Sequence, residues 1–137
     1  MYTRNVRALG VAALLCFLLP AAAFAKDPEG VWRGKLVGKQ ATVGATFTFD
    51  GKNSSAHFEA PYLCSVPLVR GAGEGDLYYT FGTSVNGGRF CQDLENVKLE
   101  LTDVSDQSLT VSFDSANAMV GRGKWSGKLT PSAATTP

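Results

Sequence analysis

The chain has 137 residues, of which 45% are hydrophobic, and its 13 basic and 12 acidic side chains give a formal net charge of +1. This length and composition predict one globular domain with a modest core. The balanced charge argues against nucleic acid and anionic membrane surfaces as partners, because both attract proteins with an excess of basic side chains.

Residues 1–25 have the pattern of a secretory signal peptide. Arg4 and Arg7 precede an apolar run over residues 8–22, and Ala23-Phe24-Ala25 then places small residues at both positions that a signal peptidase recognises. We expect cleavage after Ala25, which leaves 112 residues with 11 basic and 12 acidic side chains, a formal net charge of −1. The pattern predicts a secreted or periplasmic protein with no membrane attachment after cleavage.

Two other interpretations of this leader fit less well. An uncleaved membrane anchor requires roughly 20 apolar residues, and the apolar run is shorter. Lipidation at Cys16 requires a small residue before the cysteine, where this chain has Leu15.

Beyond the leader, apolar and polar residues alternate with a period of two, which indicates strands with one buried face. Turn residues separate these segments, as at Asp50-Gly51, in the loop 71–75 and at Asn86-Gly87-Gly88. Pro61 and Pro67 interrupt one further stretch and predict irregular or edge structure there. The expected strands span residues 30–36, 42–49, 54–60, 76–81, 96–102, 108–114 and 124–130.

Seven or eight short strands at this spacing predict an all-β domain over residues 26–130. We expect a small antiparallel up-and-down β-barrel, with a β-sandwich as the alternative. Residues 131–137 are predicted to form a disordered tail. We expect side chains to fill the interior, because many rings occupy inward positions. These rings belong to Trp32, Phe47, Phe49, Phe58, Tyr79, Phe81, Phe113 and Trp125.

The pattern G-x-W-x-G-K-L occurs twice, as GVWRGKL over residues 30–36 and as GKWSGKL over residues 123–129. In a strand, the Trp, the second Gly and the Leu share one face, so the Trp ring can lie over the space beside the Gly. No other segment is repeated, which argues against a duplicated domain. We therefore predict that the strands of Trp32 and Trp125 are neighbours and close the barrel.

Cys64 and Cys91 are the two cysteines that remain after signal cleavage. In an exported chain such a pair predicts a disulfide, which the chain-entropy model credits with roughly 3–4 kcal/mol for a loop of this size. No metal site is expected, since His57 is the only histidine and the two cysteines are far apart in the sequence. No cofactor is predicted.

Gly30-Val31-Trp32, at the entrance to the first strand, resembles the G-x-W motif that opens lipocalins and related calycin barrels. The resemblance implies an up-and-down barrel with the Trp plugging one end. It also implies a basic residue from near the last strand packed on that ring, with Arg122, Lys124 and Lys128 as candidates. As a function it implies the carriage of a small apolar ligand.

Catalytic chemistry is not expected at the single histidine. His57 shares the polar face of its strand with Ser55 and Glu59. Residues two apart on a strand project in parallel, whereas a catalytic triad requires convergent groups. We therefore expect a solvated polar face there and no enzymatic activity.

Tyr62, Arg89 and Phe90 flank the two cysteines, so a disulfide is expected to gather them on one rim of the barrel. Aromatic residues and Arg are enriched in protein interfaces. We predict that this rim binds a partner. The alternative is that these side chains only cover the disulfide.

In its expected export, small size, single disulfide and small barrel, the chain is similar to the periplasmic lysozyme-inhibitor and immunity proteins of Gram-negative bacteria. The inhibitory loop motif expected of the lysozyme inhibitors is missing from this sequence. The sequence therefore predicts a secreted or periplasmic, non-enzymatic binding protein. Its expected partner is another protein, as for an inhibitor or immunity factor, and the alternative is a calycin-like carrier of a small apolar ligand.

Overall fold

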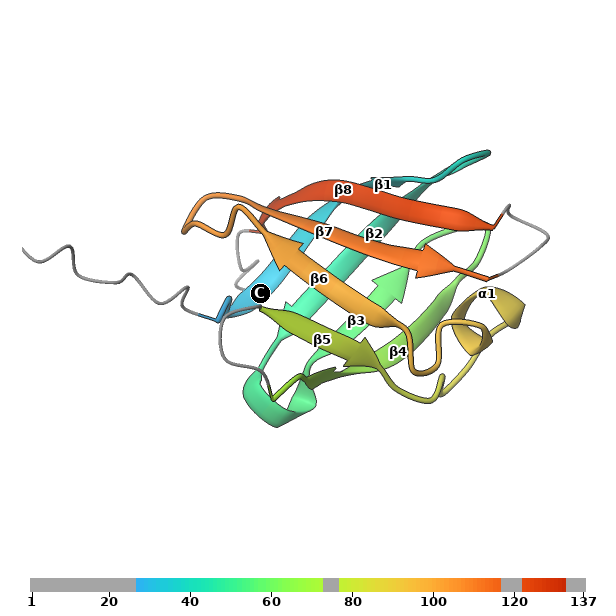
Figure 1. Cartoon of the computed structure of the whole chain (residues 1–137), viewed down its shortest axis with the longest axis horizontal. Helices are drawn as coiled ribbons and strands as arrows, with labels where there is room; N and C mark the ends of the chain where they lie inside the picture. Colours follow the sequence, from blue (N-terminus) through green and yellow to red (C-terminus); the bar gives the residue numbers. More distant parts are fainter. Residues whose placement is uncertain (1–26, 73–76, 117–121, 133–137) are drawn as a thin grey trace, which may run out of the picture.

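The computed structural model describes residues 27–72, 77–116 and 122–132. In this part of the chain each of eight strands pairs antiparallel with the next, and β8 returns to β1, so that the sheet closes into a barrel (Figure 1). The predicted all-β, up-and-down barrel is confirmed. The strands are β1 (Gly30–Val37), β2 (Thr42–Phe49), β3 (Ser55–Phe58), β4 (Cys64–Arg70), β5 (Tyr78–Phe81), β6 (Lys98–Thr102), β7 (Leu109–Ser115) and β8 (Gly123–Pro131), with the short helices η1 (Gly51–Asn53) and α1 (Arg89–Gln92).

The predicted signal peptide, residues 1–25, lies outside the described residues, as do residues 133–137 of the predicted tail. The strand β8 includes Pro131, and the N–H of Ser132 donates to the carbonyl of Val31. Regular pairing therefore continues just past the expected domain boundary at residue 130.

The period-two pattern places the apolar face of each strand inside the barrel. In β2, for example, Val43, Ala45, Phe47 and Phe49 are buried while the residues between them are partly exposed. The eight aromatic residues predicted to point inward are all buried. Each such side chain contributes roughly 1.5–3 kcal/mol when it leaves water, so this face drives folding.

Contacts of Phe58, in β3, show that side chains fill the middle of the barrel. Its ring centroid lies 6.3 Å from that of Phe47 in β2, 6.5 Å from that of Phe81 in β5 and 6.2 Å from that of Phe113 in β7. The strands β3 and β7 stand on opposite sides of the eight-stranded barrel. Rings that meet across it occupy the space that an interior ligand would need.

The repeated heptapeptide explains how the barrel closes. Strands β1 and β8 are antiparallel neighbours with Gly34 opposite Leu129, which confirms the predicted pairing. A Cβ atom added to Gly34 would collide with the carbonyl oxygen of Lys128, and one added to Gly127 would collide with that of Lys35. Each copy of the repeat therefore supplies the glycine against which the backbone of the other copy packs.

The predicted position of the Trp rings at this seam is wrong. The side chain of Leu129 lies beside Gly34, and that of Leu36 lies beside Gly127. The ring of Trp125 covers Gly38 instead, where an added Cβ would approach the ring to 2.6 Å. Side chains two apart on one strand project in parallel, so the space beside a glycine is filled from the neighbouring strand.

The prediction of irregular or edge structure is confirmed at Pro61, which lies in a turn between β3 and β4, but it is wrong at Pro67. The strand β4 is an interior member of the closed sheet, between β3 and β5. Pro67 accepts a 2.8 Å hydrogen bond from the N–H of Gly82, the residue just after β5 ends at Phe81. The N–H that Pro67 lacks would also face Gly82. The missing hydrogen bond therefore falls outside β5, and no hydrogen bond to a β5 residue is lost.

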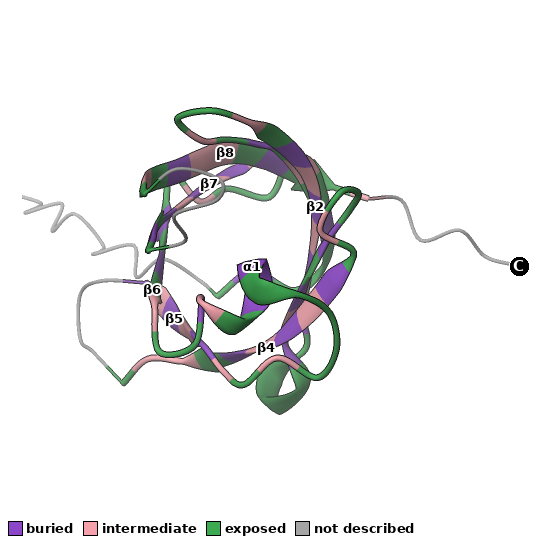
Figure 2. Ribbon diagram, turned by 90° about the vertical axis from the view of Figure 1, so that its right-hand side faces the viewer, coloured by how far each residue is buried: buried purple, intermediate pink, exposed green. Residues whose placement is uncertain are grey.

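The helix α1 had no signal in the sequence, because four residues cannot show a helical stripe. Residues 86–88, predicted as a turn, lead into it: Asn86 forms an isolated antiparallel bridge with Ser65 before α1 begins. Figure 2 shows α1 lying in front of the mouth at one end of the barrel.

The chain order gives the two barrel ends different loops. We call the end that carries α1 the disulfide end; its described residues are 38–41, 59–63, 82–97, 116 and 122. We call the other end the terminal end, because β1 begins there and β8 ends there. Its described residues are 27–29, 50–54, 71–72, 77, 103–108 and 132.

Candidate functional site

A disulfide fastens α1 to the start of β4. Cys64 and Cys91 are fully buried and their Cα atoms lie 6.1 Å apart, so the predicted disulfide is present. It joins residues 27 positions apart, and in the chain-entropy model this stabilises the fold by roughly 3–4 kcal/mol. The segment 83–97 is thereby held on the barrel mouth.

Tyr62 and Phe90 stack over this mouth, with ring centroids 4.1 Å apart and planes 10° apart. Phe90 also lies edge-on to Phe58 at 5.0 Å and to Trp125 at 5.6 Å. It is only 4% exposed, so its predicted place on the binding rim is wrong. The side chain of Phe90 belongs to the core, because α1 turns it inward while Arg89 stays outward.

Tyr62 is half-buried and packs against the core, and burial raises the pKa of its hydroxyl. Arg89 is exposed. The disulfide therefore brings the three predicted rim residues to one end, but Phe90 and Tyr62 cover the mouth and only Arg89 is freely presented. A role for Tyr62 and Arg89 in partner binding stays a prediction.

Two aliphatic residues that the sequence did not single out stand out at the disulfide end. Leu63 is 63% exposed and Val85 is 82% exposed. Leu63 also has a φ of +45°, in the left-handed region. Among the described residues, the other non-glycine positions with positive φ are Asn96 and Asp103, which are residue types that tolerate it.

The sequence offered a partial signal for these two residues. Leu63 directly precedes a cysteine at a position where strand alternation had stopped, and Val85 precedes a turn. An apolar residue in such a segment indicates exposure only when the fold is known. The left-handed backbone of Leu63 has no sequence signature, since Leu is among the residues that avoid it.

The loop that carries Val85 is fixed to β4 by several hydrogen bonds. The side-chain oxygen of Asn86 accepts from the N–H of Ser65 at 3.1 Å. The hydroxyl of Ser84 lies 2.7 Å from the carbonyl oxygen of Asn86 and 3.3 Å from that of Ser65. The exposed aliphatic side chains therefore stand on a braced backbone next to the disulfide.

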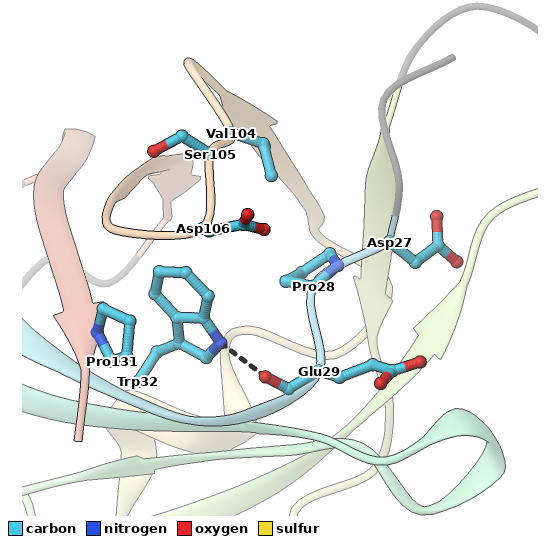
Figure 3. A pocket seen from close by; sticks show the side chains of 8 residues that line it. All are labelled: Asp27, Pro28, Glu29, Trp32, Val104, Ser105, Asp106 and Pro131. Atoms are coloured by element: carbon cyan, nitrogen blue, oxygen red, sulfur yellow. Dashed lines mark hydrogen bonds between the residues drawn. The ribbon is translucent and has the colours of Figure 1, made fainter. Parts of the chain in front are cut away.

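At the terminal end, Trp32 forms the floor of a cleft of about 280 Å³ (Figure 3). The ring is 4% exposed, and its Nε1 donates a 3.0 Å hydrogen bond to the carbonyl of Glu29. Pro28, Asp106 and Pro131 stand around it. This Trp thus lies at one end of the barrel.

The lipocalin resemblance also implies a basic residue packed on Trp32, but none of the three candidates lines the cleft around this ring. Trp32 pairs with Pro131, whereas Arg122 and Lys124 lie at or before the opposite end of β8. At about 3.3 Å per residue, the backbone of Lys124 is roughly 23 Å along β8 from Pro131. Lys128 is exposed on the outer side of the sheet, and the cleft around Trp32 is lined by other residues.

His57 lies on the outer face of β3, where it is exposed. Its Nδ1 is 2.8 Å from the hydroxyl of Ser65 on the neighbouring strand. Ser55 and Glu59 lie on the same side of the chain, and neither is hydrogen-bonded to His57 within the described residues. This is the arrangement of a solvated polar strand face.

Over residues 27–72, 77–116 and 122–132, no three His, Cys, Asp or Glu side chains cluster as metal ligands would. The same residues include no helix with the length and apolar character needed to cross a membrane. Comparisons with protein-family models, with curated proteins and with solved structures each found no match to this chain.

Proposed function

We propose that this chain is a secreted or periplasmic, non-enzymatic binding protein that docks on another protein through the disulfide end, as an inhibitor or immunity factor does. The observation that carries the proposal is Leu63, an exposed aliphatic side chain on a strained backbone beside the disulfide. A left-handed conformation costs an ordinary residue about 1–2 kcal/mol.

Neither property of Leu63 favours folding of the isolated chain. The side chain buries little apolar surface, since it is 63% exposed, and its φ of +45° would suit Asn or Gly better. Strain of this kind is commonly kept at binding sites. A partner that covers Leu63 and Val85 would recover the apolar burial that the free protein lacks.

Rigid presentation also supports a docking surface. The disulfide, the bridge between Ser65 and Asn86, and the Tyr62–Phe90 stack hold the surrounding backbone. A surface that is already ordered loses less conformational entropy on binding. Arg89, exposed on α1, adds a charged group of the type that interfaces favour.

The other two functions considered have less support. The rings around Phe58 occupy the middle of the barrel, which counts against a carrier with its ligand inside. The outward placement of His57 counts against a triad. Export is supported by the leader sequence, and the disulfide is compatible with an oxidising compartment.

Site-specific photocrosslinking tests the proposal. A photoreactive amino acid would replace Leu63 in one variant and Asp106, at the terminal end, in a matched control. Each would be expressed in the native host and irradiated. We expect one discrete protein adduct from position 63, weakened when Arg89 or Val85 is replaced by Ala, and none from position 106. Adducts from position 106 alone, or from neither position, would contradict the proposal.

A further inference from the structure

The terminal end holds a second cavity, of about 580 Å³, that shares residues 27–29 with the cleft in Figure 3. Its apolar walls come from Pro28 and Leu68, its cationic groups from Lys52 and Arg70, and its anionic groups from Asp27 and Glu29. Sites for small molecules typically measure roughly 300–1,000 Å³ and combine apolar walls with a few polar groups. The cavity lies at the mouth of the barrel, outside the filled interior.

Tyr79 supplies this cavity with an unused hydrogen-bond donor. The residue lines the cavity and is only 3% exposed. Its ring packs against Phe49 at 5.2 Å. Its hydroxyl has no hydrogen-bond partner among the described residues and is not fully enclosed by protein atoms. Burial and the Asp27 carboxylate raise the pKa of Tyr79, against the opposing effect of Arg70, so the hydroxyl keeps its proton.

Arg70 presents a partly used guanidinium near the ring of Tyr79. Its Nη1 donates to the carbonyls of Gly71 at 2.8 Å and Tyr78 at 3.1 Å, which fixes the side chain. Its Nε donates to Oδ2 of Asp27 at 3.1 Å. Nη2 has no partner among the described residues. Asp27 therefore uses only the Nε–H of the Nε–Nη2 edge, whereas a carboxylate can accept hydrogen bonds from both nitrogens of that edge.

The Arg70 guanidinium and the Tyr79 ring lie close together in this cavity. The Cζ atom of Arg70 lies 5.8 Å from the centre of the Tyr79 ring. The Asp27–Arg70 pair is half-exposed, with 31% of the Arg70 side chain and 52% of the Asp27 side chain accessible, so it is a weak contact that a ligand can replace. Lys52 is exposed on the facing wall, with no ion pair among the described residues.

We propose that this cavity binds a small amphipathic carboxylate. The ligand carboxylate takes the Nε and Nη2 edge of Arg70 in place of Asp27 and accepts a hydrogen bond from Tyr79, while the apolar part lies on Leu68 and Pro28. This binding is separate from the docking proposed for the disulfide end and does not rest on it. The segment 27–29 acts as an internal competitor, because Asp27 must leave Arg70 for the ligand to enter.

Titration with sodium octanoate, followed by amide chemical shifts in NMR spectra of the mature protein, tests this. Octan-1-ol is the matched probe that lacks the carboxylate. We expect saturable shifts confined to the cavity, with a Kd of about 1 mM or below for a ligand of this size. Octan-1-ol should bind at least about fivefold more weakly, since it loses the charge-assisted bonds.

Three variants sharpen the test. Tyr79→Phe removes only the hydroxyl and should weaken octanoate binding about fivefold or more, since a hydrogen bond to a charged group is lost. Asp27→Asn should strengthen it, because the competing charge is gone. Arg33→Gln, on the outer face of β1, is the control and should change nothing. Equal affinity for octanoate and octan-1-ol, or unchanged binding in Tyr79→Phe, would overturn the proposal.

Discussion

The same eight strands form both ends of the barrel, but one end is covered and the other is open. At the disulfide end, Phe90 of α1 stacks on Tyr62 and lies edge-on to Trp125, and a covalent bond holds this cover in place. At the terminal end, Trp32 lies at the bottom of an open cleft. Closing one end completes the core, whereas the open end leaves polar groups such as the Tyr79 hydroxyl without protein partners in the described part of the chain.

The exposed groups at the two ends also differ in kind. The disulfide end presents aliphatic side chains, Leu63 and Val85, on a backbone that is already braced. The terminal end presents charged side chains around concave surfaces, among them Asp27 and Arg70. Exposed aliphatic side chains suit a protein partner, and a concave surface with a few polar groups suits a small molecule.

The largest expected effect is loss of the cover at the disulfide end. Phe90→Ala removes a buried ring that contacts three others, and it should lower the free energy of unfolding by about 3–5 kcal/mol. Urea denaturation measures this change. Arg89→Ala, one residue away and exposed, should stay within about 0.5 kcal/mol of the parent. A small effect of Phe90→Ala would show that α1 does not complete the core.

The disulfide should come next in effect. Replacing both Cys64 and Cys91 by Ser should cost about 2–5 kcal/mol, because the unfolded chain loses its constraint. Hydrogen exchange should then show that the amides of residues 83–97 lose protection before those of β1 and β2. Uniform loss of protection along the chain would contradict the view that this bond mainly secures the cover of one end.

Two glycine substitutions, one at the seam between β1 and β8 and one away from it, test the close approach of these strands. Gly127→Ala places a methyl group against the carbonyl oxygen of Lys35 and should cost about 1–3 kcal/mol. Gly88→Ala is the control, since Gly88 has open space around its Cβ position and a φ of −84°. Thermal unfolding compares the two. Equal melting temperatures would mean that close approach at the seam does not matter for closure.

The smallest change in stability is expected at the terminal end. Asp27→Asn breaks a half-exposed ion pair and should alter the free energy of unfolding by less than about 1 kcal/mol. Salt should reduce even this difference, because ions screen exposed charges. A loss comparable to that of Phe90→Ala would show that residues 27–29 close this end as firmly as α1 closes the other.

Much of the barrel could be predicted because its information is local. Alternation in β2 and β7 fixes which side chains point inward, and the paired heptapeptides marked the strands that meet. The strand β4 could not be predicted, because the tolerance of Pro67 depends on where β5 ends. Local sequence does not contain that register.

The candidate site was harder to predict for a similar reason. The cysteines correctly placed Tyr62, Arg89 and Phe90 at one end, but the turn of α1 decided which of them faces solvent. Leu63 became notable only through its backbone angle and exposure. The pairing of Arg70 with Asp27 spans 43 positions of sequence, which no short motif could reveal.

The most direct test of this account is a Leu63→Asn variant measured for both stability and binding. Asn tolerates a positive φ, so the melting temperature should stay the same or rise, while binding to the protein recovered by crosslinking should weaken about tenfold or more. That combination would show that Leu63 is kept for a partner at the expense of the fold. A melting temperature several degrees lower, with binding intact, would mean that Leu63 serves the fold and that the docking surface lies elsewhere.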